Sequence, residues 1–400
     1  MTTWTIAKRA ASMETSAIRE ILKLTEQKDV ISFAGGLPAP ELFPVEGIRR
    51  ACQDVLQNQG PQSLQYSLST GIRPLKQFLA QRLKNRGIDI TEDNLLITGG
   101  SQQGLDIIGK AFIDSGTVII TENPSYLGAI QAFSAYRPVY VTVEMDEEGM
   151  LVDQLEARIK KYYPRFIYTV PTFQNPTGRT LSYRRRVQLV ELSKQYNIPI
   201  VDDNPYSELR YSGEEVPSIK AIAGDWVIQL GTFSKIVSPG LRIGWIVAPL
   251  DLMPVLEKMK QALDLHTNTF SQYVIWEYCK EGRLEKHIER LKEAYRERRD
   301  VMIESMQEFM PEEVFWTKPE GGLFLWVHLP EGTNSTQLLK IAVEKKVAYV
   351  PGTGFFPNGG GENTLRMNFS NATEEQIREG VKRLAKVFKE QIERAVAVPT

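Results

Sequence analysis

Residues 232–242 have the side chains of a site for a phosphorylated aldehyde. They read Thr-Phe-Ser-Lys-Ile-Val-Ser-Pro-Gly-Leu-Arg and follow an apolar run at 226–230. The hydroxyls of Thr232 and Ser234 and the guanidinium of Arg242 can donate hydrogen bonds to a phosphate. The amine of Lys235 can capture an aldehyde as an imine once its pKa is lowered, and nearby Arg242 favours that change. Because a lysine after a strand is often a solvated loop residue, this interpretation depends on the segments that accompany it.

A second segment offers another anion site. Gly99-Gly-Ser-Gln-Gln-Gly104 follows an expected strand and opens an expected helix. Its backbone N–H groups would face an anion at the positive end of the helix dipole. Taken alone, the segment is more typical of a glycine turn with a serine N-cap. Together with residues 232–242, it would hold one phosphate from two sides.

Carboxylate and amide side chains end two further expected strands. Asp202 and Asp203 precede Asn-Pro-Tyr, and either they cap a turn or one of them points inward. An inward carboxylate would keep a pyridine nitrogen protonated, so that the ring accepts electrons from a substrate carbanion, and Tyr206 would donate to the ring oxygen. Asn175 begins Asn-Pro-Thr-Gly, an ordinary turn sequence that draws interest only through its position at a neighbouring strand end. This set predicts pyridoxal phosphate as the cofactor.

These candidates lie at strand ends in an expected α/β fold. Short apolar runs alternate with helical patterns between about residues 95 and 248, which predicts a mainly parallel sheet sandwiched by helices. Ligand chemistry in such folds occurs at the carboxyl ends of the strands. The expected strands are 95–98, 117–121, 139–143, 166–170, 198–201, 226–230 and 243–248, and the expected helices include 101–113, 151–161 and 182–196.

The C-terminal part of the chain predicts a smaller α+β domain. A polar helical region at about 268–309 precedes a strand at 323–329, a helix near 334–346, a strand at 364–369 and a final helix capped by Thr373. Because 400 residues exceed the usual size of a single core, we expect two structural units. We assign residues 1–50 to an N-terminal segment that includes a mobile helix and part of the small domain, 51–294 to the large domain and 295–400 to the small domain.

The composition narrows the class of protein. Lys plus Arg total 48 against 49 Asp plus Glu, which argues against a nucleic-acid partner or a basic membrane-binding surface. Cys52 and Cys279 form no CxxC pair, as is typical of a reducing compartment, and His287 and His328 have no metal-ligand spacing, so we expect no metal site. The polar N-terminus and the lack of a run of 18 apolar residues predict a cytoplasmic protein without a membrane span.

Taken in order, these motifs resemble the fold-type I pyridoxal-phosphate aminotransferases. The resemblance runs from Ser-Phe-Ala-Gly-Gly-Leu-Pro, which starts at residue 32, to Leu-Arg-Met-Asn-Phe at 365–369, and so covers nearly the whole chain. Between them lie Ser-Gln-Gln-Gly at 101–104, Asn-Pro-Thr-Gly at 175–178, Asp-Asp-Asn-Pro-Tyr at 202–206 and the lysine segment at 234–242. Within that superfamily the chain is most similar to the 2-aminoadipate, or kynurenine/2-aminoadipate, aminotransferase branch.

The resemblance implies a role for each residue near the cofactor. Lys235 would link to the cofactor and move the proton between the substrate α-carbon and the cofactor, as both nucleophile and base. Asp203 would pair with the pyridine nitrogen, while Asn175 and Tyr206 would hold the ring oxygen. The implied aromatic plate is Tyr126, and the implied phosphate cup consists of Ser101, Gln102, Thr232, Ser234 and Arg242.

The resemblance also implies substrate contacts. Arg366 and Asn175 match the clamp for the α-carboxylate, and an inter-strand ion pair is the ordinary alternative for Arg366. Gly36 matches the backbone that closes over the substrate. Arg19 resembles an arginine on a mobile N-terminal helix that binds the distal carboxylate of 2-aminoadipate or glutamate, although a solvated arginine on an amphipathic helix is equally common.

Tyr66 matches a tyrosine that reaches the phosphate of the neighbouring subunit, which implies a homodimer with shared sites. Its ordinary alternative is a tyrosine with a local hydrogen bond at a domain edge.

The sequence therefore predicts a transaminase that moves an amino group from an amino acid, with 2-aminoadipate or glutamate favoured, to a 2-oxo acid such as 2-oxoglutarate by a ping-pong mechanism. A broad-specificity aromatic or branched-chain aminotransferase is the alternative. A non-catalytic, effector-sensing regulator is disfavoured, because the first motif starts by residue 32 and leaves no room for a preceding DNA-binding domain.

Overall fold

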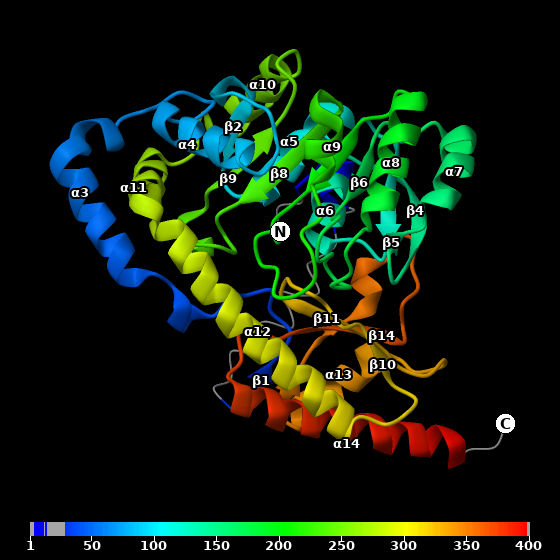
Figure 1. Cartoon of the computed structure of the whole chain (residues 1–400). Coiled ribbons are helices and arrows are strands. Elements are labelled where there is room, and N and C mark those ends of the chain that lie inside the picture. The colour runs from blue at the N-terminus through cyan, green and yellow to red at the C-terminus, as the bar shows by residue number, and fades with distance from the viewer. Residues whose placement is uncertain (1–3, 12, 14–28, 398–400) are drawn as a thin grey trace.

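The fold is built around one large, mainly parallel sheet, as the sequence predicts. The computed structural model describes residues 4–11, 13 and 29–397, and within them eight strands form this sheet in the order β2-β9-β8-β7-β6-β3-β4-β5 (Figure 1). The strands from β4 through β3, β6 and β7 to β8 are parallel, whereas β9 is antiparallel to both of its neighbours. Their bounds are β2 Leu95–Thr98, β3 Val118–Asn123, β4 Val139–Asp146, β5 Gly149–Met150, β6 Ile167–Thr169, β7 Ile200–Asp203, β8 Val227–Thr232 and β9 Gly244–Val247.

Two central strands extend beyond the apolar runs that predict them. The runs end at residues 201 and 230, whereas β7 ends at Asp203 and β8 ends at Thr232. Of these added residues, Asp202, Asp203 and Thr232 are polar but buried, so a hydrophobic pattern does not mark them as strand residues. Asp203 and Thr232 thus belong to the sheet rather than to the loops that follow it.

Consecutive residues of β7 face different helix layers. Ile200 packs in the core cluster shared with α7 (Leu155–Tyr162), α8 (Tyr183–Gln195) and α9 (Ile219–Ala223). Val201 belongs to the cluster that includes residues of α5 (Ser101–Phe112) and α6 (Leu127–Ser134). Because side chains alternate along a strand, Asp202 lies on the α8–α9 face and Asp203 on the α5–α6 face.

A smaller antiparallel sheet forms the second unit, at the bottom of Figure 1. Its strands have the order β10-β11-β14-β13; β13 packs with α13 (Ser335–Glu344), which packs in turn with α14 (Glu374–Ala397). Thr373 caps α14 as expected, since its hydroxyl accepts a hydrogen bond from the backbone N–H of Gln376. A parallel pair between β1 (Ile31–Ser32) and β12 (Val347–Ala348) attaches the N-terminal segment to this unit. The four strands are β10 Phe315–Trp316, β11 Phe324–His328, β13 Val350–Pro351 and β14 Thr364–Asn368.

The helical region expected at 268–309 consists of two helices, α11 (Thr269–Cys279) and α12 (Arg283–Phe309). Positive φ angles at Glu281 and Gly282 separate them. Helix α12 runs from the large unit to the small one, where it packs on α14 (Figure 1). Because α12 crosses residue 294, where we place the domain boundary, that boundary stays a prediction. The other α-helices described are α1 Lys8–Ala11, α3 Val45–Ser63, α4 Arg73–Lys84 and α10 Met253–Asp264.

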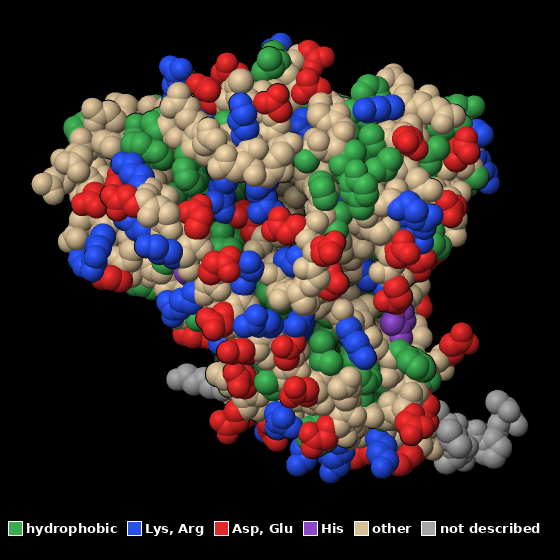
Figure 2. Space-filling model, viewed as in Figure 1, with side chains coloured by type: hydrophobic (Ala, Val, Ile, Leu, Met, Phe, Trp, Pro, Cys, Tyr) green, Lys and Arg blue, Asp and Glu red, His purple; other side chains and the backbone are tan. Residues whose placement is uncertain are grey.

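Charges of both signs are interspersed over the face shown in Figure 2, and no single-sign field dominates it. None of the helices in the described part of the chain is long and apolar enough to cross a bilayer. Within the same residues, no group of three or more His, Cys, Asp and Glu side chains is arranged to hold a metal ion.

Candidate active site

Side chains from the ends of β6, β7 and β8 and from the start of α5 surround a cavity of about 130 Å³, which we call the Lys235 cavity. The carboxyl ends of the parallel strands meet here, where ligand sites of open α/β sheets form. All of the cofactor residues predicted on these elements line the cavity, together with Val170, Pro205 and Pro239; they are Ser101, Gln102, Tyr126, Asn175, Asp203, Tyr206, Thr232, Ser234, Lys235 and Arg242.

The amine of Lys235 lies against the backbone of the N-terminal segment. Its Nζ donates a hydrogen bond to the carbonyl oxygen of Gly36 at 2.7 Å. Burial lowers the pKa of the amine to about 8, and the positive charges of Arg366 and Arg242 add to the effect. A large fraction of the amine is therefore neutral near pH 8, as a nucleophile or proton acceptor requires.

Of the two consecutive carboxylates, Asp203 is the one that lines the Lys235 cavity. Its Oδ2 accepts a hydrogen bond from the hydroxyl of Tyr168 at 2.8 Å, whereas its Oδ1 is buried and has no partner among the residues that the structure describes. Burial raises the pKa of Asp203 to about 7, and the hydrogen bond from Tyr168 opposes that change. On the other face of the sheet, Asp202 accepts a hydrogen bond from Nε2 of Gln229 at 2.9 Å.

Hydroxyls and a guanidinium gather at the end of the cavity next to α5. The hydroxyl of Thr232 donates to that of Ser234 at 2.9 Å, and Arg242 donates to the carbonyl oxygen of Gly99 at 3.0 Å. Gly100 has a φ of 84°, and a Cβ there would lie only 2.6 Å from the Arg242 guanidinium. The guanidinium therefore lies directly on the backbone where α5 begins, and this end of the cavity is suited to an anion.

Arg366 of β14 joins the small unit to the large one. Its Nη1 donates to Oδ1 of Asn175 at 2.8 Å, and its Nη2 donates to the carbonyl oxygen of Ala34 at 2.9 Å. Asn175 in turn donates from Nδ2 to the hydroxyl of Tyr206 at 3.3 Å. Two residues that are 191 positions apart in the sequence thus share one hydrogen bond at the edge of the Lys235 cavity.

The surroundings of Arg366 are those of an anion site rather than of an ion pair. The residue is 2 % exposed, and burial lowers its pKa to about 10. Its guanidinium carbon lies 4.3 Å from the ring centroid of Phe324 and 5.2 Å from that of Phe355, while Nε has no partner within the described ranges. In the described part of the chain, no carboxylate forms a salt bridge with it, so the inter-strand ion pair considered above is absent. A buried cation of this kind favours an anionic ligand.

Two other predicted residues form the wall between α5 and α6. Nε2 of Gln102 donates to the carbonyl oxygen of Gly128 at 2.8 Å. Burial raises the pKa of the Tyr126 hydroxyl to about 12. A Cβ on Gly128 would lie 2.5 Å from the Tyr126 ring and 2.7 Å from the Gln102 amide, so glycine is needed for this close packing.

Two predicted residues are not brought to the cavity by the described part of the chain. Tyr66 is 79 % exposed, and its ring meets the ring of His266 edge-on with centroids 5.7 Å apart. Its role toward a neighbouring subunit stays a prediction. Arg19 lies outside the described residues, so its proposed contact with substrate also stays a prediction.

Two buried polar residues of this region lie outside the sequence motifs described above. Tyr168 donates to Asp203, and Glu122 accepts hydrogen bonds from Thr169 and Gln174 beneath the turn that carries Asn175. The signal that could have identified them is a polar side chain within or directly after an apolar run. Tyr168 lies within the run at 166–170, and Glu122 directly follows the run at 117–121.

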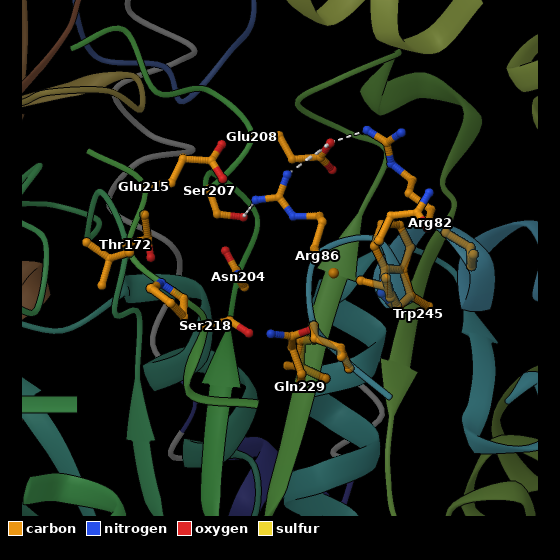
Figure 3. A pocket seen from close by; sticks show the side chains of 18 residues that line it. Arg82, Arg86, Thr172, Asn204, Ser207, Glu208, Glu215, Ser218, Gln229 and Trp245 are labelled. Atoms are coloured by element: carbon orange, nitrogen blue, oxygen red, sulfur yellow. Dashed lines mark hydrogen bonds and ion pairs between the residues drawn. The ribbon is translucent and has the colours of Figure 1, made fainter. Parts of the chain in front are cut away.

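A larger cavity, of about 290 Å³, lies on the other side of β7 and β8 and shares no lining residue with the Lys235 cavity (Figure 3). In Figure 3, Arg86 lies between Ser207 and Glu208, and Arg82 binds the same glutamate. Because these charges are paired with one another, we place the candidate chemistry in the Lys235 cavity.

Known proteins that are similar to this chain match it over nearly its whole length. The family model for class I and II aminotransferases matches residues 28–384. The aromatic-amino-acid aminotransferase 1 of Thermococcus litoralis is 50% identical over 395 residues, which cover 97% of this chain and 95% of that protein. The 2-aminoadipate transaminase of Thermus thermophilus is 42% identical over 386 residues, which cover 96% of each chain.

A solved structure agrees in fold. The kynurenine aminotransferase of Pyrococcus horikoshii, crystallised in complex with PMP, with KYN as substrate and KYA as product, superposes with a TM-score of 0.93. It is 46% identical in sequence, and the match covers 97% of both chains.

Proposed function

Because this chain belongs to the family of class I and II aminotransferases, which depend on pyridoxal phosphate, we propose that it exchanges an amino group between a second amino acid and the pair glutamate/2-oxoglutarate by a ping-pong mechanism. The observation that carries this proposal is the convergence of Lys235, Asp203 and Arg242 on one cavity, with Arg366 at its edge. An amine, a carboxylate and two cations are the groups that such a reaction needs.

The residues of the Lys235 cavity fit the cofactor. The unpartnered Oδ1 of Asp203 is an acceptor for a protonated pyridine nitrogen, since a buried acceptor is otherwise costly to leave unsatisfied. Asn175 and Tyr206 are the residues that would hold the ring oxygen. The phosphate would lie among the side chains of Ser101, Gln102, Thr232, Ser234 and Arg242, with Tyr126 against the ring.

When bound, pyridoxal phosphate supplies an electron sink for the carbanion that forms at the substrate α-carbon. Lys235 first acts as the nucleophile and then accepts the proton from the α-carbon, for which its lowered pKa is suited. Asp203 keeps the proton on the ring nitrogen. Arg366 and Asn175 bind the α-carboxylate and so restrain the α-carbon, while the backbone of Gly36 closes the site near Lys235.

The first candidate for the second amino acid is 2-aminoadipate. It is supported by the 42% identity to a 2-aminoadipate transaminase and by the resemblance of Arg19 to a distal-carboxylate ligand. Among the described residues that line the Lys235 cavity, the cations are Lys235 and Arg242, and both have other roles in this proposal. A distal carboxylate therefore requires a further cation, and Arg19 is the residue that we assign to it.

The second candidate is an aromatic amino acid. The 50% identity to an aromatic-amino-acid aminotransferase and the match to a kynurenine aminotransferase favour it. Both candidates use the same cofactor residues, and one arginine serves both if it binds acidic side chains and moves aside for aromatic ones.

A panel of amino acids assayed with 2-oxoglutarate tests the substrate proposal. We expect turnover of both glutamate-like and aromatic donors by the wild type. Arg19→Ala should reduce kcat/KM selectively for 2-aminoadipate and glutamate by about 10–100-fold, the range for loss of a charged hydrogen bond. An equal loss for acidic and aromatic donors, or no loss for either, would exclude the role of Arg19.

A further inference from the structure

Glu122 is a buried carboxylate that the proposed reaction does not use. It lies near the end of β3, is 1 % exposed and does not line the Lys235 cavity. Its Oε1 accepts from the hydroxyl of Thr169 at 2.5 Å, and its Oε2 accepts from the backbone of Val170 at 3.3 Å and from Nε2 of Gln174 at 3.1 Å. None of these partners is a cation, so the carboxylate is stabilised by hydrogen bonds alone.

The Gln174 amide carries this contact into the turn that follows β6. Besides Glu122, its Nε2 donates to the carbonyl oxygen of Pro124 at 2.9 Å. Its Oε1 accepts from both the backbone N–H and the hydroxyl of Thr177, at 2.9 and 2.7 Å. An amide whose nitrogen and oxygen both have fixed partners has one orientation. Glu122 therefore helps to determine the shape of the turn at 174–177.

Asn175 lies between the two ends of that turn and is the link to Arg366. In the part of the chain that the structure describes, Arg366 has two polar anchors, Oδ1 of Asn175 and the carbonyl oxygen of Ala34, and its Nε has none. A change in the turn thus removes or redirects one of the two anchors of the guanidinium. We propose that Glu122 is a positioning residue that acts through Gln174 and Asn175 to hold Arg366 in the orientation that receives the substrate carboxylate. The inference rests on the proposed function, in which Arg366 binds that carboxylate.

The hydrogen-bond donors around Glu122 determine which substitution at this position preserves the contact with Gln174. With glutamine at this position, the side-chain oxygen still accepts from Val170 and Gln174, and the hydroxyl of Thr169 turns to accept from the new amide. Burial raises the pKa of the Glu122 carboxyl to about 7, with Asp203 as the charged group that adds to the rise, so a neutral side chain is tolerated here. Alanine removes the acceptor, so that Nε2 of Gln174 keeps only its hydrogen bond to the carbonyl oxygen of Pro124 and the backbone N–H of Val170 loses its contact with Glu122.

The test is the affinity of the holoenzyme for α-methylglutamate, which has no α-proton to lose, measured by isothermal titration calorimetry. Glu122→Ala and Gln174→Met should each raise Kd about tenfold, whereas Glu122→Gln should stay within about twofold of the wild type. The matched control is Gln229→Met, which removes a buried glutamine from Asp202 on the other face of the sheet and should leave Kd unchanged. Gln174→Met leaves Glu122 itself intact, so the test does not depend on the folding of one variant.

A double-mutant cycle separates positioning from a general loss of structure. In an Asn175→Ala background, Glu122→Ala should change Kd by less than about twofold, because its route to Arg366 is already broken. The same tenfold increase in that background, or no increase in the wild-type background, would overturn the proposal. Arg366→Met tests the carboxylate clamp separately from the role of Glu122. If Arg366→Met raises Kd while Glu122→Ala does not, only the role of Glu122 fails. If Arg366→Met leaves Kd unchanged, the carboxylate clamp of the proposed function fails and the role of Glu122 fails with it.

Discussion

The hydroxyl of Tyr168 donates a hydrogen bond to Oδ2 of Asp203 at 2.8 Å, while no described residue forms a hydrogen bond with Oδ1 of the same carboxylate. One oxygen is thus oriented by the protein and the other is left for a ligand. Burial raises the pKa of Asp203 from 3.8 to about 7, against the effect of the Tyr168 hydroxyl. Below about pH 7 the neutral form is therefore favoured in the folded protein without cofactor, and a cationic group that binds there stabilises the charged form.

This relationship predicts a pH dependence for the cofactor-free protein. Because the pKa of Asp203 is higher in the folded than in the unfolded state, the stability that it contributes is complete below pH 4 and is lost as the pH rises through about 7. The difference corresponds to at most about 4 kcal/mol. Asp203→Asn should therefore raise the melting temperature of the cofactor-free protein more at pH 8 than at pH 5. With cofactor bound, Asp203→Asn should instead have a lower melting temperature than the wild type. An equal rise in melting temperature at pH 5 and pH 8 would contradict the proposal that the buried charge of Asp203 destabilises the cofactor-free protein.

The second prediction concerns Lys235. Its pKa is lowered to about 8, so the neutral amine increases as the pH rises through that value. The rate at which cofactor-free protein takes up pyridoxal phosphate, followed by visible absorbance in a stopped-flow instrument, should rise with pH, reach its midpoint near pH 8 and level off above that midpoint. Arg366→Met should move the midpoint to higher pH, since a cation that disfavours the ammonium is removed. Lys235→Ala is the control, and it should show no band from a lysine-linked cofactor and at least about 10³-fold lower kcat.

The third prediction concerns the aromatic rings beside Arg366. Phe324 and Phe355 face its guanidinium carbon at 4.3 and 5.2 Å. Cation–π contacts of this kind contribute about 0.5–2 kcal/mol. Phe355→Leu should therefore raise KM for every amino donor by about 2–10-fold and leave kcat within about twofold. Phe356→Leu is the matched control, because that ring packs against Trp326 and has no cation–π contact with Arg366. Equal effects of the two substitutions on KM would contradict the proposed role of the Phe355 ring.

Much of the fold follows from the alternation of apolar runs and helical patterns, because burial in a parallel sheet requires such runs. The run at 95–98 predicts β2 residue for residue. The prediction fails where the site begins, since β7 continues through Asp202 and Asp203 and β8 continues to Thr232. A hydrophobic pattern cannot recognise strand residues whose burial is compensated by hydrogen bonds.

The same reason limits prediction of the site. Lys235, Asp203 and Asn175 are recognisable because they stand in short ordered motifs. The contacts of Glu122 with Thr169 and of Tyr168 with Asp203 join residues that are 47 and 35 positions apart. Neighbouring strands of a parallel sheet are separated by a helix in the sequence. The number of positions between two residues along the chain therefore does not indicate that they form such a pair. Only the order of the strands brings these residues together.

The last prediction concerns Tyr66. This residue is 79 % exposed and does not line the Lys235 cavity of its own chain. We expect it to complete the site of a neighbouring subunit, as the family resemblance implies, and we test this with a hybrid dimer in which one chain carries Lys235→Ala and the other carries Tyr66→Ala. One site then contains both defects and the other contains both Lys235 and Tyr66. Each variant alone should have low activity, whereas hybrid dimers purified through two different tags should recover about half of the wild-type kcat. A hybrid that carries both substitutions in one chain, paired with a wild-type chain, is the control, because each of its sites contains one defect. Recovery in this control, or its absence in the test hybrid, would show that Tyr66 acts within its own chain.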